Sequence, residues 1–267
     1  MNILAFFAHP DDETLLAGGT LALLARQGMQ VHYLCATRGE GGELGEPPLC
    51  TREELGDVRE QEVVGAVKAL GGRSLTFLGH VDPTLGVGEH GEALHYGFTD
   101  NLTLLAGQVA ASIQQFQPAA VFSHGSHGEY GHPGHILCYQ AARIAVESLG
   151  EGAPRLYTIG AKFPGHPRPH SINPDDPAHL VVDITPALPQ KEQAALCHRT
   201  QHALLTRTAS QKAGHTVSIP EVLVRLESFH RAVPPWNPAD GDPVVEALKP
   251  FLYANFHAPG GSPAEAA

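Results

Sequence analysis

Short apolar runs alternate with longer stretches of helical periodicity through the first two thirds of the chain. The apolar runs are typical of buried strands and lie at Asn2–Ala8, Gln30–Thr37, Ser74–Leu78 and Ala119–Ser123. The helical stretches lie at Glu13–Gln27, Thr51–Leu70, Asp100 or Asn101 to Gln117, and Ile136–Leu149. Strands that alternate with helices predict βα units, in which consecutive strands run parallel. We therefore expect an α/β protein with a Rossmann-like, mostly parallel sheet and helices on both faces.

The last third of the chain is less regular. Its expected elements are strands at Arg155–Gly160 and Leu180–Ile184, a helix at Lys191–Leu205 and a weaker helix around Pro220–Ala232. The segment Gly79–Thr99 shows no clear period, and no internal repeat or linker divides the chain. We therefore expect a single domain at residues 1–256, followed by a flexible tail at 257–267.

Composition narrows the classes of partner. Asp and Glu outnumber Lys and Arg by 28 to 17, a formal net charge of −11, so no basic stripe is available for a nucleic acid. The apolar run Ile3–Ala8 is too short for a membrane span, and no basic segment precedes it as in a signal peptide. The four cysteines form no CxxC pair, which indicates reduced thiols and a cytoplasmic location. Histidine occurs 17 times and is the commonest metal ligand, so a metal site is the first possibility to test.

The first polar motif, His9-Pro10-Asp11-Asp12-Glu13, lies where the first strand ends and the first helix begins. Acidic residues in a first helical turn suit the positive end of the helix dipole, but that does not account for the preceding histidine. Two adjacent carboxylates also repel one another unless a positive charge lies close to them. A divalent metal bound by His9 and Asp12 would supply that charge. We therefore interpret this motif as half of a metal site.

The second motif, His132-Pro133-Gly134-His135, follows the fourth strand and opens another helix. In an open parallel sheet, the loops at the carboxyl ends of the strands meet where the strand order reverses. If the first and fourth strands are neighbours there, one histidine of this motif completes a His/Asp/His set. Such a set leaves a fourth position for water, which is the arrangement of a catalytic zinc site.

A site of this kind points to hydrolysis. Zinc lowers the pKa of a bound water to roughly 7 and so generates a nucleophile at neutral pH. Because Asp12 is engaged with the metal, Asp11 is the better general base, and the histidine that does not bind metal is the better stabiliser of an oxyanion. Zinc is the expected ion, although a His₂Asp site also accepts Fe²⁺ or another divalent metal.

Together these segments resemble the PIG-L/LmbE family of zinc-dependent deacetylases, which remove acetyl groups from substrates that contain N-acetylglucosamine. The resemblance extends from Asn2 to about Ala232. The matching segments are Ala8–Glu13, Ala36–Glu40, Arg59–Glu62, Leu78–Asp82, Tyr130–His135, and Lys191–His198 with Gln201.

The resemblance implies a role for each site residue. It implies a zinc-dependent hydrolase of linear amide bonds, with Asp11 as the base and His132 as electrophile or general acid. It also implies contacts to sugar hydroxyls from Arg59 and Asp82, and stabilisation of the tetrahedral intermediate by Tyr130. The implied metal ligands are His9, Asp12 and His135. Relatives usually carry an aspartate where this chain has Gly134, so His132 lacks its usual carboxylate partner.

The implied substrate is a small glycoside of the bacillithiol or mycothiol precursor type, and the family analogy implies a homo-oligomer. Two alternatives remain open: a non-catalytic protein of the same fold that binds metal or sugar, and a deacetylase of chitooligosaccharides. A serine hydrolase is disfavoured because the chain has no GxSxG elbow. A nucleotide-binding module is disfavoured because neither GxGxxG nor a P-loop lysine follows the first strand.

Overall fold

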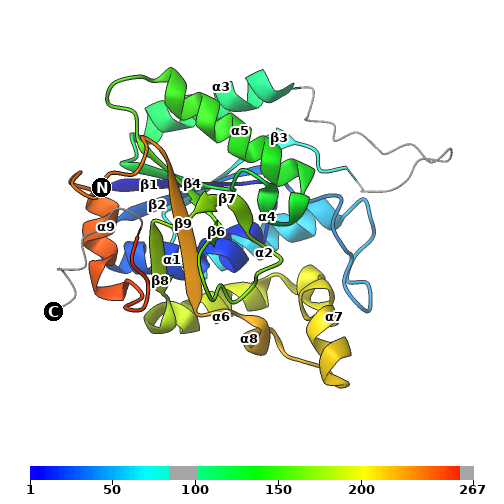
Figure 1. The fold of residues 1–267 in the computed structure, drawn as a ribbon. Coiled ribbons are helices and arrows are strands. Elements are labelled where there is room, and N and C mark those ends of the chain that lie inside the picture. Colours follow the sequence, from blue (N-terminus) through cyan, green and yellow to red (C-terminus); the bar gives the residue numbers. More distant parts are fainter. Residues whose placement is uncertain (84–100, 259–267) are drawn as a thin grey trace.

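The computed structural model of the chain describes residues 1–83 and 101–258 (Figure 1). The strands of its main sheet are β1 Asn2–Phe7, β2 Gln30–Thr37, β3 Ser74–His80, β4 Ala120–Ser123, β5 Arg155–Ile159, β8 Leu180–Asp183 and β9 Leu226–Val233. Their order across the sheet is β3-β2-β1-β4-β5-β9-β8. The first five run parallel, whereas β9 runs antiparallel to both of its neighbours. The predicted fold class, an α/β protein with a mostly parallel sheet, is confirmed.

Helices connect most of these strands. The longer ones are α1 Asp12–Arg26, α2 Leu55–Ala69, α3 Leu102–Phe116, α5 Pro133–Ser148, α6 Leu188–Cys197 and α7 His202–Ala213. The shorter ones are α4 Gly128–Gly131, α8 Ile219–Val222 and α9 Pro243–Leu248, with 3₁₀ turns at Thr185–Ala187, Arg199–Gln201 and Lys249–Phe251. None of the helices in the described part of the chain is long and apolar enough to cross a membrane.

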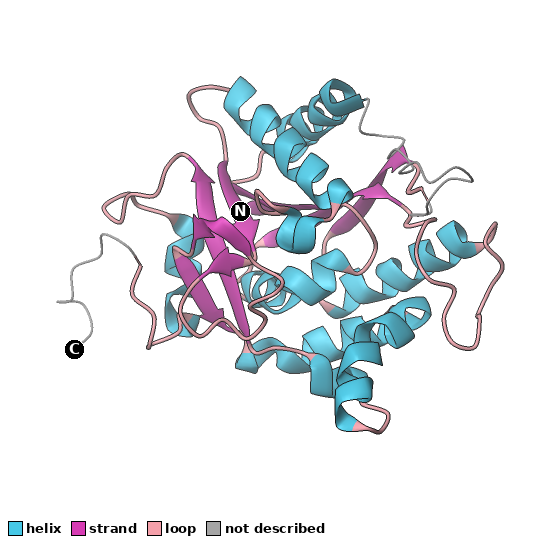
Figure 2. Cartoon of the chain, turned by 45° about the vertical axis from the view of Figure 1, so that its right-hand side comes forward, coloured by secondary structure: helices cyan, strands magenta, loops and turns pink. Residues whose placement is uncertain are grey.

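The sheet lies between two hydrophobic cores, because successive residues of a buried strand point to opposite faces. Ile3, Ala5 and Phe7 of β1 pack into one core with residues of α1, α2, α6 and α9. Leu4 and Phe6 pack into the other core with residues of α3 and α5. Figure 2 shows the strands as a layer with helices on both sides. Helices α1 and α5 therefore lie on opposite faces of the sheet.

The predicted weaker helix around Pro220–Ala232 is wrong. Only the four residues of α8 are helical there, and the rest forms β9, an internal strand of the sheet. Two charged side chains of β9, Glu227 and Arg231, are buried against oppositely charged partners elsewhere in the chain. Because their charge masks the alternation expected of a half-buried strand, the hydropathy pattern is misleading here.

Other differences are smaller. The predicted helix Lys191–Leu205 is two helices, α6 and α7, separated at His198 by the short 3₁₀ turn. The small sheet of β6 Ala161–Lys162 with β7 Asn173–Pro177, and helix α9, were not predicted. Most of the irregular segment Gly79–Thr99 and of the expected tail at 257–267 lies outside the described residues.

A buried ion pair between α6 and β9 holds α1 in place. The Lys191 ammonium of α6 donates to Glu227 Oε1 at 2.7 Å and to the Leu15 carbonyl of α1 at 3.0 Å. Glu227 also accepts from the N–H groups of Gly19 and Thr20, at 2.9 and 2.7 Å. The two charged groups therefore fix the position of the helix whose first turn carries Asp12.

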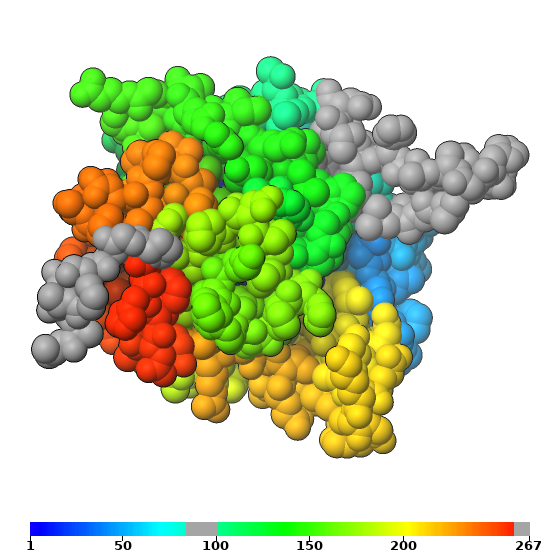
Figure 3. Space-filling view, viewed as in Figure 1, coloured from blue at the N-terminus to red at the C-terminus, as the bar shows by residue number. Residues whose placement is uncertain are grey.

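The last described segment lies along β8 rather than over the carboxyl ends of the parallel strands. Leu252 forms a bridge with Val182, and Tyr253 N–H donates to the Val181 carbonyl at 2.8 Å. Figure 3 shows this segment in red beside the yellow-green residues around β8. This segment therefore covers part of β8, the edge strand of the sheet.

Candidate metal centre and active site

Strands β1 and β4 are parallel neighbours, with Ile3 paired to Ala120 and Ala5 to Phe122. The helices that follow them, α1 and α5, pack on opposite faces, so the strand order reverses between β1 and β4. Loops at such a reversal diverge and leave a crevice for ligands. The expectation that the first and fourth strands are neighbours at this point is therefore confirmed, and the two His-Pro motifs face one another.

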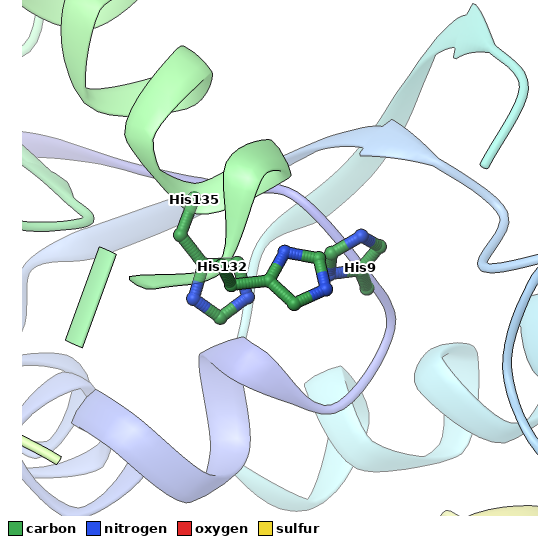
Figure 4. Close-up of side chains that lie close together, drawn as sticks. All are labelled: His9, His132 and His135. Carbon is green, nitrogen blue, oxygen red and sulfur yellow. The ribbon is translucent and has the colours of Figure 1, made fainter. Parts of the chain in front are cut away.

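Three side chains of the predicted metal site converge in this crevice. Asp12 Oδ2 lies 3.3 Å from His9 Nδ1, and Asp12 Oδ1 lies 3.2 Å from His135 Nε2. All three side chains are buried. Figure 4 shows the three imidazoles close together, with the His132 ring between those of His135 and His9 in this view. The ring centroids of His132 lie 4.8 Å from His9 and 4.4 Å from His135.

These residues fit a divalent metal. In the described part of the chain, His9 Nε2 and His135 Nε2 are buried and make no hydrogen bond. Ligand atoms of His9, His132 and His135 lie within 4.8 Å of one another, as do those of Asp12, His124 and His135. Imidazole nitrogens with a carboxylate oxygen suit Zn²⁺ and related divalent ions. The crevice thus offers the donor set of a metal site.

His124 makes a different contact from the other imidazoles. Its Nε2 accepts a hydrogen bond from the Ala8 N–H at 3.1 Å, so the lone pair of that nitrogen is occupied. Its Nδ1 lies 2.9 Å from Glu129 Oε2. His124 therefore lies close to Asp12 without a lone pair available to a metal.

Asp11 begins α1 in a conformation that few residues adopt. Its φ is 122°, and its N–H donates to Glu13 Oε2 at 2.9 Å. Glu13 Oε1 lies 2.9 Å from His198 Nε2, which anchors the turn to α6. Burial raises the pKa of Asp11 to about 6, against the opposing positive charge of Arg59. A carboxylate with a pKa near neutrality suits a general base.

The residues expected to bind sugar hydroxyls are both buried. Arg59 donates to the carbonyls of Gly39 and Pro10, and its Nη2 lies 3.2 Å from Asp11 Oδ2. Asp82 Oδ1 lies 3.3 Å from His9 Nε2, and its Oδ2 accepts from the Gly41 N–H. Each thus contacts a residue of the predicted site directly, and a role in sugar binding stays a prediction.

His132 and Tyr130 lie at the open side of the cluster. Tyr130 is 60% exposed, and its ring centroid lies 5.4 Å from that of His135. Burial, followed by the positive charges of His135 and His9, lowers the pKa of His132 to about 3. His132 is therefore neutral at pH 7 and suited to donate one hydrogen bond to a developing negative charge.

Gly134 packs tightly between imidazoles. A Cβ atom at this position would lie 3.3 Å from His132 Nδ1 and 3.3 Å from His9 Nε2. An aspartate, the residue usual in relatives, would require the two rings to separate by a few tenths of an ångström. The absence of a side chain at Gly134 therefore allows His9 and His132 to lie this close together.

Sequence reasoning missed Glu129. Its Oε2 lies 2.6 Å from His135 Nδ1 and 2.9 Å from His124 Nδ1, and its Oε1 accepts from the Gly125 N–H and from Asn173 Nδ2. Metal-binding histidines commonly donate their second N–H to a carboxylate. A search for carboxylates close in sequence to His135 would have pointed to this residue.

Addition of metal should release protons from the site. Burial lowers the pKa of His9, but Asp12 and Asp82 outweigh it and raise that pKa to about 9. His135 likewise has a pKa of about 10, because Asp12 and Glu129 outweigh the effect of its burial. If these imidazoles are the ligands, zinc binding at pH 7 should release about two protons and should strengthen as the pH rises toward 9.

Calorimetry in two buffers of different ionisation enthalpy measures this release. A zinc-binding reaction that releases less than one proton would contradict the assignment of His9 and His135 as ligands.

A cleft of about 720 Å³ lies elsewhere, against α2. Its lining includes Leu49, Val58, Gly65 and Cys197, and none of the residues predicted for the site. We therefore place the candidate active site where the polar groups converge, and not at the cleft against α2.

Residues 4–146 match the sequence profile of the family PIG-L, described as GlcNAc-PI de-N-acetylase. The chain is 34% identical over 166 residues to 1D-myo-inositol 2-acetamido-2-deoxy-alpha-D-glucopyranoside deacetylase 3 of Catenulispora acidiphila, covering 57% of this chain but only 46% of that longer protein. It is 30% identical over 231 residues to a 1D-myo-inositol 2-acetamido-2-deoxy-alpha-D-glucopyranoside deacetylase of Mycolicibacterium smegmatis, covering 75% of this chain and 80% of that one. It is also 28% identical over 228 residues to a probable N-acetyl-alpha-D-glucosaminyl L-malate deacetylase 2 of Bacillus anthracis, covering 85% and 92% of the two chains.

Solved structures share the fold. The N,N'-diacetylchitobiose deacetylase of Pyrococcus horikoshii has a TM-score of 0.55 and 20% identity over 86% of this chain and 82% of its own. GalB, the 4-carboxy-2-hydroxymuconate hydratase of Pseudomonas putida, has a TM-score of 0.58 and 23% identity over 90% of this chain and 99% of its own. Two different reactions thus occur on one fold, so the fold alone does not assign the activity. The matched profile spans more than half of the chain and includes both His-Pro motifs, and the protein therefore belongs to the PIG-L family of de-N-acetylases.

Proposed function

We propose that this protein is a zinc-dependent N-deacetylase that removes the acetyl group from a small glycoside containing N-acetylglucosamine. The observation that carries the proposal is the convergence of His9, Asp12 and His135 at the strand-order reversal. Two of their ring nitrogens make no hydrogen bond among the described residues, and Asp11 lies immediately beside Asp12. A metal site next to a carboxylate of raised pKa is the arrangement expected of a metal-assisted amide hydrolase.

The proposed ligands are His9, Asp12 and His135, and a divalent ion held there would supply a Lewis acid and a water of lowered pKa. Asp11 accepts a proton from the attacking water on a carboxylate oxygen. The water oxygen forms a bond to the acetyl carbonyl carbon, and the C–N bond breaks as the proton held by Asp11 passes to the nitrogen, so that the amine leaves and acetate remains. His132 donates a hydrogen bond to the carbonyl oxygen as it gains charge, and Tyr130 at the open rim assists it.

Arg59 positions the base, and Asp82 lies beside a proposed metal ligand. Arg59 holds one oxygen of Asp11 and the Pro10 carbonyl, so the other oxygen of Asp11 remains available for the proton. Asp82 lies beside His9, where its charge favours the approach of a cation. Arg59 and Asp82 are engaged with protein groups, so we propose that they contact sugar hydroxyls after their side chains move on substrate binding.

The substrate class follows from the relatives named above, two of which are named for an inositol glycoside and one for a malate glycoside of N-acetylglucosamine. We infer that the substrate of this protein is a precursor of the mycothiol or bacillithiol type. Chitooligosaccharides are the second candidate, favoured by the structural similarity to a diacetylchitobiose deacetylase.

The test is release of acetate by zinc-loaded protein from a panel of N-acetylglucosaminyl inositol, malate and chitobiose substrates, before and after chelation. The proposal expects release from at least one substrate, loss on chelation and recovery with added zinc. No acetate from any member of the panel, with metal bound, would leave a non-catalytic binding protein as the better description. A hydratase activity without acetate release would place the protein functionally with GalB.

A further inference from the structure

Glu129 is a buried carboxylate that both imidazoles of a stacked pair share. The rings of His124 and His135 lie 3.9 Å apart at an interplanar angle of 20°. Glu129 Oε2 is 2.9 Å from the Nδ1 of the first and 2.6 Å from the Nδ1 of the second. A carboxylate that receives several hydrogen bonds stays ionised and can only accept, so both Nδ1 atoms must carry a hydrogen.

The two imidazoles differ at their other nitrogen. His124 Nε2 accepts from the Ala8 N–H, whereas His135 Nε2 makes no hydrogen bond among the described residues and lies 3.2 Å from Asp12 Oδ1. With the Nδ1 hydrogens fixed, the lone pair of His124 is directed at the backbone, whereas Nε2 of His135 points to the centre of the crevice and offers its lone pair there once a metal displaces its proton. One carboxylate thus separates a structural imidazole from a metal-binding one.

We propose that Glu129 is the positioning residue of the metal centre: it holds His135 with the hydrogen on Nδ1, so that Nε2 is presented to a divalent cation. This inference rests on the proposed function, since it requires that His135 binds a metal. It adds a residue that neither of the two sequence motifs contains.

The backbone at Glu129 supports a dedicated role. Its φ of 61° and ψ of −56° correspond to a strained γ-turn conformation that residues with a side chain rarely adopt. The Asn173 side chain holds it there: Oδ1 accepts from the Glu129 N–H at 3.1 Å, and Nδ2 donates to Glu129 Oε1 at 3.2 Å. Local strain of this kind persists only where the surroundings enforce it.

The decisive variant is Glu129→Gln, which keeps the shape of the side chain. Its amide keeps one acceptor oxygen and replaces the other by an NH₂ group, so either the two Nδ1–H groups or the Gly125 N–H and Asn173 Nδ2 lose their acceptor. In both cases the neutral amide holds His135 less firmly than the carboxylate does. We expect the dissociation constant for Zn²⁺, measured by competition with a chromogenic chelator, to rise about 10- to 100-fold. The matched control is Glu147→Gln, which removes an exposed carboxylate at the far end of α5 and should leave zinc affinity unchanged.

A spectroscopic readout distinguishes positioning from a general loss of structure. Wild-type zinc protein should show two downfield imidazole N–H proton resonances, from His124 and His135, and Glu129→Gln should shift both upfield or abolish them, because the two groups share one oxygen and a neutral amide accepts more weakly than a carboxylate. Glu129→Gly relieves the backbone strain but removes the acceptor of four buried groups, so its zinc affinity is compared after circular dichroism has shown a folded apo protein, and that affinity should be lost.

The outcomes separate this inference from the proposed function. Unchanged zinc affinity in folded Glu129→Gln and Glu129→Gly, with wild-type protein binding zinc and releasing acetate, would overturn the role of Glu129 and leave the deacetylase intact. Weakened affinity in both variants, with no acetate released by zinc-loaded wild-type protein, would support the role of Glu129 at a metal centre that performs another reaction.

Discussion

Replacement of Asp11 by asparagine should lower kcat/KM for acetate release by about 10²- to 10⁴-fold, because the amide cannot accept the proton of the attacking water. Asparagine suits the test since it tolerates unusual backbone conformations, and φ at this residue is 122°. Arg59 Nη2 can still donate to the amide oxygen, so the turn should persist. Acetate release under saturating zinc, with zinc affinity measured in parallel, gives the result.

The control for this substitution is Asp57→Asn, at an exposed carboxylate of α2 that pairs with Arg38. It should leave kcat/KM unchanged. An Asp11→Asn protein that binds zinc normally and keeps more than a tenth of the wild-type rate would assign the base to another group.

The largest expected effect on stability comes from Lys191→Met. Both members of the Lys191–Glu227 pair are fully buried, and removal of one charge leaves the other without compensation. We expect the free energy of unfolding to fall by about 3–5 kcal/mol, which is typical when one partner of a buried ion pair is removed. Urea unfolding of the apo protein, followed by circular dichroism, measures the change.

The exposed Lys212 of α7 provides the control, because Lys212→Met removes the same charge from the surface. Its effect should be small, since exposed ion pairs contribute little. A loss of less than about 1 kcal/mol in Lys191→Met would mean that Glu227 is stabilised sufficiently by the N–H groups of Gly19 and Thr20 alone.

The parallel half of the fold could be predicted from the sequence because its strands are continuous apolar runs. β1 and β2 coincide with the expected runs within a residue, and α1 follows from the spacing of buried Ala17, Leu21 and Leu24. β9 could not be predicted in the same way. Its buried charges, Glu227 and Arg231, are neutralised by residues outside the strand, and that compensation exists only once the chain has folded.

For the candidate site too, the features that are local in sequence could be predicted and those that depend on the folded arrangement could not. Each His-Pro motif is local in sequence, so its position at a strand end could be predicted, and the pairing of β1 with β4 brings the two together. Glu129 and His124 were not predicted as functional because their partners, Ala8 and Asn173, come from other segments of the chain. The contact of Arg59 with Asp11 likewise depends on how α2 packs beside the first motif.

The arrangement of the two cores gives the proposed ion a role besides chemistry. His9 and Asp12 belong to the connection that leads into one core, and His135 belongs to α5 in the other. An ion bound by all three would therefore act as a removable cross-link between elements that pack on opposite faces of the sheet. Binding to the native state alone adds about 4 kcal/mol of stability at a free concentration one thousand times the dissociation constant. The free energy of unfolding of this protein would then depend on the concentration of free metal around it.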